Sequence, residues 1–291
     1  MYYLGPAFRK IRHAKNLTLK EATEGVVSAN FASRWERGLS KITTANLTGL
    51  LEKTATTYEE LMLIHHHHDI SLLNQHFFEK VDEYVNVKNL DGLYSLMEQE
   101  EQRTNTISTL LKKHRLIILK QRINQMNKLP FENNKIKIII DYLQKIDLWG
   151  IYELSLYANS IFMLSASSVT KLSTLAQQKG THYQELSNVT EEICNASANT
   201  AIYFLDNNMP NNAISTIHIA QEFLEKKNLF YEKNRFSFLE GIYLLEINKY
   251  EYGLKKIANA IHRLNEMATP ETISLYHAYL EKALIKNFPK R

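Results

Sequence analysis

Apolar residues recur every three or four positions along most of the chain, which is the spacing of amphipathic helices. In the first 64 residues this spacing is punctuated by helix-capping signals. Thr18 and Glu21 are spaced as a capping box, as are Thr57 and Glu60, and Ser28 suits the N-cap of a further helix. The pattern predicts a compact bundle of five short helices in this part of the chain.

The helices predicted after residue 70 are longer, and in the C-terminal half they repeat. Four positions of one unit recur forty residues later: Ala213, Ile217, Ala220 and Leu224 return as Gly253, Ile257, Ala260 and Leu264. Small residues let paired helices approach closely, and aliphatic residues fill the seam between them. A forty-residue period with two helices per unit is typical of a solenoid of helical hairpins, somewhat longer than the tetratricopeptide repeat.

The repeat predicts the individual helices of the solenoid. The first helices of three units are expected at about 148–164, 190–208 and 229–247, the second helices at about 168–179, 211–227 and 250–266, and a capping helix after Pro270. Glycine and proline are scarce, at 9 and 5, which also favours long helices with few tight turns. We therefore predict an all-α protein.

Three segments make up the predicted chain. A helical bundle over residues 1–64 is followed by a linker over 65–70 and a solenoid of tetratricopeptide-like hairpins over 71–291. The linker contains His65 to His68, but four consecutive histidines point around a whole helix and cannot converge on one ion, so we expect no metal site. No apolar run is long enough for a membrane-spanning helix, and the start carries no secretory signal. A single cysteine, Cys194, fits a reducing compartment, so we expect a cytoplasmic protein.

The net charge of +4 is unevenly distributed. Residues 1–64 hold nine lysines and arginines against six acidic residues, which leaves +3 of the excess in the first fifth of the chain. A small basic end on a longer, nearly neutral chain is typical of proteins with a nucleic-acid-binding domain, although neutral partners also tolerate it.

Residues 18–37 have the spacing of a helix-turn-helix, whose second helix lies in the major groove of DNA. Phe31 and Trp35, four residues apart, are expected to face inward. Asparagine can grip adenine and arginine can grip guanine, while the amides beside Ser28 suit a phosphate. The candidate DNA contacts are Arg9, Arg12, Ser28, Asn30, Ser33, Arg34, Arg37 and Lys41. The alternative is that these are solvated charges on an ordinary helical bundle.

Three segments resemble the Xre-type helix-turn-helix: Phe8–Arg12, Leu17–Glu21 and, above all, Ser33–Gly38. The last reads Ser-Arg-Trp-Glu-Arg-Gly, and the resemblance implies that its glutamate, Glu36, buttresses the fold rather than touching DNA. Combined with the forty-residue helical repeat, nearly the entire chain resembles the Rgg/MutR family of regulators in Gram-positive bacteria.

That resemblance implies a role in quorum sensing. Such regulators are homodimers that bind paired half-sites of a double-stranded DNA operator, and they switch transcription when a short signalling peptide docks in the concave surface of the repeats. Some members form an intersubunit disulfide through a cysteine of the DNA-binding domain. Here residues Thr43–Ala45 contain no cysteine, so that covalent dimer is excluded.

Capture of an extended peptide requires side chains that hydrogen-bond a free backbone, and an asparagine amide offers a donor and an acceptor in one plane. Asn159 and Asn199 lie forty residues apart on helices expected to line the concave side, and the resemblance supports a peptide-binding role for both. The candidate peptide contacts are Asn159, Asn195, Asn199, Tyr203, Arg235 and Phe238. The alternative is that the asparagines bond to neighbouring helices and fix their stacking.

No catalytic signature occurs, neither a glycine-rich phosphate loop nor His-Glu-x-x-His nor Gly-x-Ser-x-Gly, so we expect neither enzyme activity nor a cofactor. The acidic clusters Glu98–Glu101 and Glu191-Glu192 are expected to be solvated helix faces. Two other functions stay open: a repeat adaptor that binds another protein, and a dimeric helix-turn-helix repressor whose repeats bind no ligand. The basic face around Arg34 argues against the first, and the repeated asparagines argue against the second.

Overall fold

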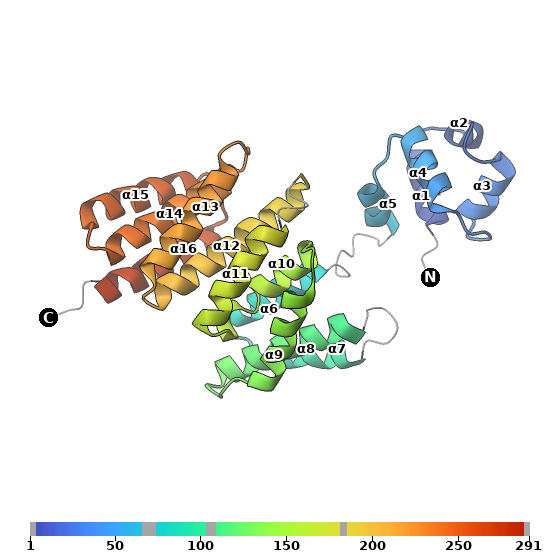
Figure 1. Cartoon of the computed structure of the whole chain (residues 1–291). Coiled ribbons are helices and arrows are strands. Elements are labelled where there is room, and N and C mark those ends of the chain that lie inside the picture. Colours follow the sequence, from blue (N-terminus) through green and yellow to red (C-terminus); the bar gives the residue numbers. More distant parts are fainter. Residues whose placement is uncertain (1–3, 66–73, 103–108, 181–184, 288–291) are drawn as a thin grey trace. The chain divides into compact units, whose positions relative to one another are not determined.

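The computed structural model describes residues 4–65, 74–102, 109–180 and 185–287, and within these ranges the protein is all-α, as predicted (Figure 1). The chain divides into two compact units, Met1–Phe77 and Phe78–Arg291. Residues 66–68 of the histidine run and most of the expected linker at 65–70 lie outside the described residues, so the expected domain limits and the reading of that run stay predictions.

The first unit contains the five predicted helices. They are α1 (Gly5–Ala14), α2 (Leu19–Thr23), α3 (Ala29–Glu36), α4 (Thr44–Lys53) and α5 (Tyr58–His65). The capping box at the start of α2 is formed: the Glu21 amide donates to the Thr18 hydroxyl at 3.3 Å, and the Thr18 amide donates to the Glu21 carboxylate at 2.7 Å. Ser28 caps α3 by accepting a hydrogen bond from the Phe31 amide at 3.2 Å. Local sequence therefore sets where these helices begin.

The core of the first unit is built on Phe8 and Trp35, whose ring centroids lie 5.1 Å apart, with Leu50 and Leu61 packed into the same cluster. Gly5 brings α1 against α3. A Cβ atom at this position would lie 1.9 Å from the Trp35 carbonyl oxygen, so only glycine allows the two helices to approach this closely. The apolar side of α1 thus packs against α3, the helix that carries most of the candidate DNA contacts.

Helices of the solenoid follow in hairpin order. They are α6 (Asn74–Asn86), α7 (Leu90–Gln102), α8 (Thr109–Met126), α9 (Asn133–Lys145), α10 (Ile151–Ala158), the short 3-10 helix η2 (Ile161–Met163), α11 (Ala166–Gly180), α12 (Ser187–Asp206), α13 (Pro210–Leu224), α14 (Phe230–Glu246), α15 (Tyr250–Leu264) and α16 (Pro270–Asn287). The helix predicted at 148–164 is wrong in length, because α10 ends at Ala158 and the chain continues through a turn into η2. The later predicted helices are confirmed within a few residues.

The forty-residue repeat is present in the structure from the first hairpin, before the C-terminal half in which the sequence shows it. In four hairpins, the second residue after the end of the first helix has a positive φ. These residues lie forty residues apart, or a multiple of forty: Lys88, Lys128, Asn208 and Asn248. The amide of the next residue then donates to the carbonyl five residues back, at 2.8 or 2.9 Å, in each of the pairs Asn89–Tyr84, Leu129–Asn124, Met209–Phe204 and Lys249–Leu244. These bonds define a Schellman turn that closes each hairpin. The α10–α11 hairpin, where η2 intervenes, lacks it.

The predicted seam between paired helices is confirmed. All the repeated positions from Ala213 to Leu224 and from Gly253 to Leu264 are buried. Gly253 of α15 faces Gly241 of α14, and a Cβ atom on Gly253 would lie 2.9 Å from the Gly241 carbonyl oxygen. Helices α14 and α15 therefore touch backbone to backbone, as their close pairing in Figure 1 shows.

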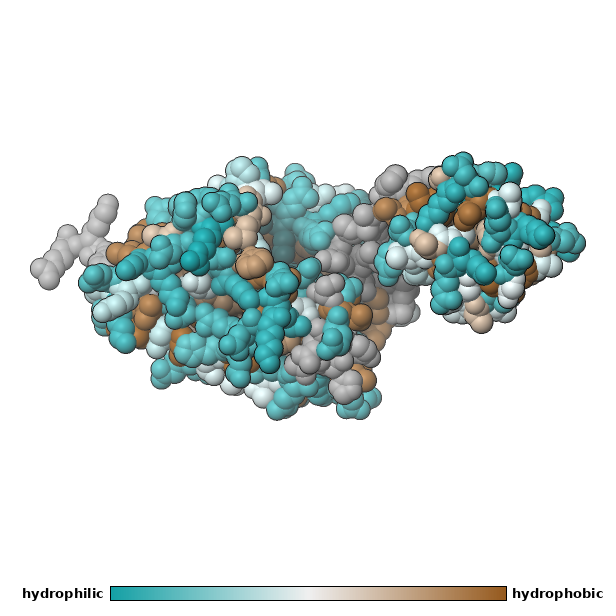
Figure 2. All heavy atoms as spheres, turned by 90° about the horizontal axis from the view of Figure 1, so that it is seen from above, coloured by the Kyte–Doolittle hydropathy of each residue, from teal (hydrophilic) through white to brown (hydrophobic). Residues whose placement is uncertain are grey.

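Two acidic residues expected at a solvated face are buried instead. Glu100 is 1% exposed and accepts a hydrogen bond from the Arg115 guanidinium at 3.0 Å. Glu192 is 7% exposed, and burial raises its pKa. Both lie in interfaces between helices, which their local sequence does not reveal. In Figure 2 the visible surface of each unit is dominated by hydrophilic residues, and no helix within the described ranges is long and apolar enough to cross a membrane.

Candidate DNA-binding and peptide-binding sites

Helix α3 and its C-cap residue, Arg37, present a polar face that carries three of the predicted DNA contacts. Asn30, Arg34 and Arg37 are exposed, whereas Trp35 on the opposite side is buried. The Arg37 Nε donates to the Ser33 carbonyl at 3.1 Å, which lays its guanidinium back along the helix. The face therefore offers amide and guanidinium donors, which are the groups that read base edges.

The other candidates come from several segments of the first unit. Arg9, Ser28 and Lys41 are exposed, and Ser33 is half-buried. The Ser28 oxygen already caps α3, so its hydroxyl hydrogen is what it can offer to a phosphate oxygen. These residues come from α1, from the turn between α2 and α3, and from the segment after α3.

Arg12 does not lie on this surface, so the prediction that it contacts a DNA phosphate is wrong. The side chain is buried, and it donates to the Glu36 carboxylate from Nε at 2.6 Å and from Nη2 at 2.8 Å. Its Nη1 donates to the Leu17 carbonyl at 2.8 Å. The hydrogen bond to Glu36 raises the pKa of Arg12. Glu36 therefore stabilises the fold, as expected, and its partner is Arg12.

In the solenoid, a polar cluster links α12 to α14. The guanidinium of Arg235 donates to the Asn195 side-chain oxygen at 2.7 Å and lies 3.6 Å from the Glu232 carboxylate. Glu232 is 8% exposed, and burial raises its pKa more than the charge of Arg235 lowers it. Asn195 and Arg235, forty residues apart, are therefore brought together as a bonded pair on neighbouring first helices.

The two repeated asparagines are not equivalent in the structure. Asn199 lies within α12, and its amide nitrogen is 3.5 Å from the Ala158 carbonyl, a long hydrogen bond across to α10. Asn159 follows the last residue of α10 and donates to the Ser155 carbonyl of its own helix at 2.9 Å. Both side chains are half-buried. The Tyr203 hydroxyl donates to the Leu164 carbonyl at 3.1 Å, so all three polar groups have contacts within the fold.

A cavity of about 210 Å³ opens beside the Asn195–Arg235 pair, between α12, α14 and α16. Arg235 and Phe238 line it, together with Ile202 and Tyr279. Phe238 is buried, and its ring packs edge-on against Tyr276 at 4.9 Å. Sequence reasoning missed the tyrosines of α16, although their spacing of three residues marks one face of that helix.

Cys194 adjoins this cluster but is inert in the structure. It is fully buried, and burial raises the pKa of its thiol to about 12, as expected for a small buried hydrophobe. Among the described residues, no three histidine, cysteine, aspartate or glutamate side chains are grouped so that they could hold a metal ion.

Comparison with protein families identifies the repeat unit. Residues 93–278, more than half of the chain, match the family described as the C-terminal domain of the HTH-type transcriptional regulator Rgg. The chain belongs to the Rgg family of transcriptional regulators. The match covers every helix of the solenoid that carries a candidate peptide contact, and it confirms the family expected from the sequence.

Solved structures share the fold of this Rgg-family chain over nearly its whole length. A candidate transcriptional regulator from Listeria monocytogenes EGD-e is 21% identical, with a TM-score of 0.84 over 98% of both chains. The SHP pheromone receptor Rgg2 from Streptococcus dysgalactiae is also 21% identical, with a TM-score of 0.77 over 97% of this chain and 99% of that one. PrgX in complex with cCF10 is 15% identical, with a TM-score of 0.72 over 98% and 94%.

Proposed function

We propose that this Rgg-family chain is a peptide-responsive transcription regulator that binds a specific DNA operator as a homodimer. The observation that carries the proposal is the polar face of α3. Its arginines and Asn30 are exposed, while the only carboxylate of the helix, that of Glu36, is buried against Arg12. Donor groups without a competing acid suit the major groove, where guanine and adenine offer acceptors.

Dimerisation follows from the size of this surface. A single helix-turn-helix reads one short half-site, and proteins of this kind gain affinity and spacing specificity by presenting two copies. The solenoid, which makes up most of the chain, is the part available to join them. We assign dimerisation to residues 71–291.

The ligand proposal rests on the cluster around Arg235 and on the solved relatives, one of which is a pheromone receptor and another a complex with cCF10. An extended peptide advances about 3.3 Å per residue, so stacked helices about 10 Å apart meet it at every third residue. Asn199 and Arg235, on α12 and α14, could then hold one peptide of roughly eight residues, with an apolar side chain in the cavity beside Phe238.

A second candidate function has one observation in its favour. Asn159, Asn199 and Tyr203 all bond within the fold, as expected if they fix the stacking of helices. In that case the protein is a dimeric helix-turn-helix repressor whose repeats take no ligand. The two functions differ in one measurable property, which is whether a peptide changes the affinity of the protein for its operator.

The test begins with selection of a binding site from random DNA duplexes by the full chain. Short peptides with apolar tails, encoded beside the gene of this protein, are then titrated into the protein–DNA complex. We expect a palindromic site, and one peptide that changes its affinity. A selected site that no peptide affects favours the ligand-independent repressor, and failure to select any site contradicts the DNA-binding proposal.

A further inference from the structure

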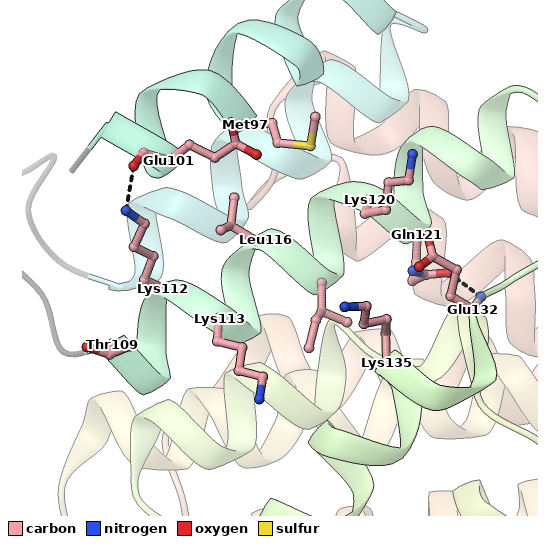
Figure 3. A pocket seen from close by; sticks show the side chains of 11 residues that line it. Met97, Glu101, Thr109, Lys112, Lys113, Leu116, Lys120, Gln121, Glu132 and Lys135 are labelled. Atoms are coloured by element: carbon pink, nitrogen blue, oxygen red, sulfur yellow. Dashed lines mark hydrogen bonds between the residues drawn. The ribbon is translucent and has the colours of Figure 1, made fainter. Parts of the chain in front are cut away.

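A second groove lies in the solenoid away from the candidate peptide contacts. It encloses about 580 Å³ between α7 and α9, with α8 as its floor (Figure 3). Helices α7 and α9 are the second helices of two successive hairpins, whereas the candidate peptide contacts lie on α12 and α14, which are first helices, and at the end of α10. A volume of this size suits a small organic molecule.

The floor of the groove is apolar. Met97 of α7 and Leu116 of α8 are half-buried and point into the same space in Figure 3. Ile117 also lines the groove and is buried. Removal of such surface from water favours binding of an apolar body.

The rim carries excess positive charge. Four lysines line the groove against two glutamates: Lys112, Lys113, Lys120 and Lys135 against Glu101 and Glu132. Lys112 donates to the Glu101 backbone carbonyl at 2.5 Å and is held in place. Lys113, Lys120 and Lys135 are exposed, and their ammonium groups can move toward a ligand. The groove therefore attracts an anion through its rim while its floor takes an apolar group.

At one end of the groove, Gln121 leaves hydrogen-bond donors unused. Its side-chain oxygen accepts a hydrogen bond from the Glu132 amide at 2.9 Å, which fixes the orientation of the carboxamide. The nitrogen, Nε2, is buried and has no partner within the described residues. An unpaired buried amide is costly, so native proteins rarely leave one without an acceptor. Gln121 lines the groove, so an oxygen of a bound ligand is the acceptor that this nitrogen lacks.

We propose that the α7–α8–α9 groove is a second ligand site, which binds a carboxylate with an apolar body. The carboxylate lies among Lys113, Lys120 and Lys135 with one oxygen directed toward Gln121, and the apolar part covers Met97 and Leu116. Two sources share this chemistry: a free medium-chain fatty acid and the C-terminal end of an apolar peptide. The site is independent of the candidate peptide contacts on α12 and α14 and of the helix-turn-helix unit.

The test titrates octanoate into the full chain by calorimetry, with octylamine as the ligand of equal length and opposite charge. We expect saturable one-to-one binding of octanoate and at least tenfold weaker binding of octylamine. Equal binding of the two ligands, or no binding of octanoate, would overturn the proposal, because the lysine rim would then have no role.

A triple variant locates the site. Replacement of three exposed lysines (Lys113→Gln, Lys120→Gln and Lys135→Gln) should weaken octanoate binding about tenfold or more, since each exposed ion pair contributes up to about fivefold. The matched control removes three exposed lysines from parts of the solenoid that do not line the groove: Lys171→Gln, Lys226→Gln and Lys255→Gln. It has the same net charge and should bind as the wild type does. Equal loss in both variants means that only overall charge matters, and it contradicts the assignment.

Two further arms separate the sources and the sites. Acetyl-trileucine with a free C-terminal carboxylate is compared with its C-terminal amide: displacement of octanoate by the acid alone identifies a peptide end as a competent ligand, and displacement by neither leaves the free fatty acid as the source. Arg235→Ala tests independence from the concave cavity. Octanoate affinity should not change in this variant, and its loss would place the fatty acid in the cavity beside Phe238 and overturn the groove assignment.

Discussion

Arg12 and Glu36, twenty-four residues apart, form a buried ion pair with two hydrogen bonds, at 2.6 and 2.8 Å, that joins α1 to the C-terminal end of α3. Arg12 also donates to the Leu17 carbonyl at the start of the helix-turn-helix. The pair therefore fixes the helix that carries the predicted DNA contacts, and the positive charge of Arg12 stabilises the fold of the N-terminal unit.

Removal of one partner of this pair should destabilise the first unit strongly. Arg12→Ala leaves the Glu36 carboxylate buried without its partner, at a cost of about 3–5 kcal/mol in the free energy of unfolding. Arg9→Ala, an exposed position on the same helix, is the matched control and should change stability by about 0.5 kcal/mol or less. Urea denaturation of both variants measures the difference. An Arg12→Ala variant as stable as the control would show that the ion pair contributes nothing.

Arg34 and Lys41 should affect DNA binding in different ways. Loss of a base contact in Arg34→Ala should cost about 1–3 kcal/mol on the selected operator and relax the preference at one base pair. Loss of a phosphate contact in Lys41→Ala should weaken binding to all duplexes alike and reduce the slope of log affinity against log salt by about one unit. Gel-shift titrations at several salt concentrations measure both effects.

The control for these variants is Lys53→Ala, at the C-terminal end of α4. It removes one exposed positive charge of the same unit but none of the predicted DNA contacts. It should leave the base preference unchanged. If Lys53→Ala and Arg34→Ala lose affinity equally on specific and nonspecific duplexes, α3 is not the recognition helix.

Much of the fold could be predicted because its signals are local. The capping boxes at Thr18 and Thr57 and the apolar periodicity fix the helices within a few residues, and the small residues at 213 and 253 mark the seam. The role of Arg12 could not be predicted. The local sequence around an arginine does not distinguish one that contacts DNA from one that pairs with a buried glutamate, and the partner here lies twenty-four residues away in α3.

The candidate ligand site was harder to predict for the same reason. Asn159 and Asn199 share a repeat position, but α10 ends one residue before Asn159, so the repeat does not give them the same surroundings. The forty-residue period predicts that Asn195 and Arg235 lie close together on neighbouring helices. It does not predict the hydrogen bond between their side chains. The spacing of the tyrosines of α16 marks one face of that helix, but the sequence does not show that this face packs against α14 and lines the cavity.

His114 should make stability depend on pH. The residue is fully buried, its Nδ1 lies 2.7 Å from the Tyr152 hydroxyl, and burial together with the charge of Lys113 lowers its pKa to about 4 from 6.5. Between these two values the unfolded chain binds a proton that the folded chain does not. The free energy of unfolding should therefore fall by about 3 kcal/mol as the pH falls from 6.5 to 4.

His114→Gln removes this titration and can keep a hydrogen bond to Tyr152, so the variant should lose less stability over the same pH range. His262→Gln, on an exposed position of α15, is the control and should follow the wild-type profile. Urea denaturation at half-unit steps of pH measures all three proteins. A His114→Gln profile parallel to that of the wild type would show that the imidazole is not responsible.

Self-association should reside in the solenoid. Sedimentation of residues 70–291 should give a dimer, whereas residues 1–69 should sediment as a monomer and bind the operator far more weakly than the full chain, because two linked half-site readers bind cooperatively. Retention of dimerisation by the short fragment, or its absence from the long one, would contradict this assignment.

Asn199 offers the clearest separation between ligand binding and architecture. Its hydrogen bond to the Ala158 carbonyl is long, at 3.5 Å, so Asn199→Ala should change the free energy of unfolding little. If a peptide backbone pairs with this carboxamide, its loss leaves polar groups of the bound peptide unpaired, at a cost of about 1–3 kcal/mol or ten- to a hundredfold in affinity. Asn207→Ala is the matched control, since Asn207 is the C-cap of the same helix, is exposed and donates to the Tyr203 carbonyl at 2.8 Å. Thermal denaturation and peptide titration of both variants separate the outcomes: a destabilised Asn199→Ala with normal peptide affinity would make this asparagine part of the architecture and place the peptide elsewhere.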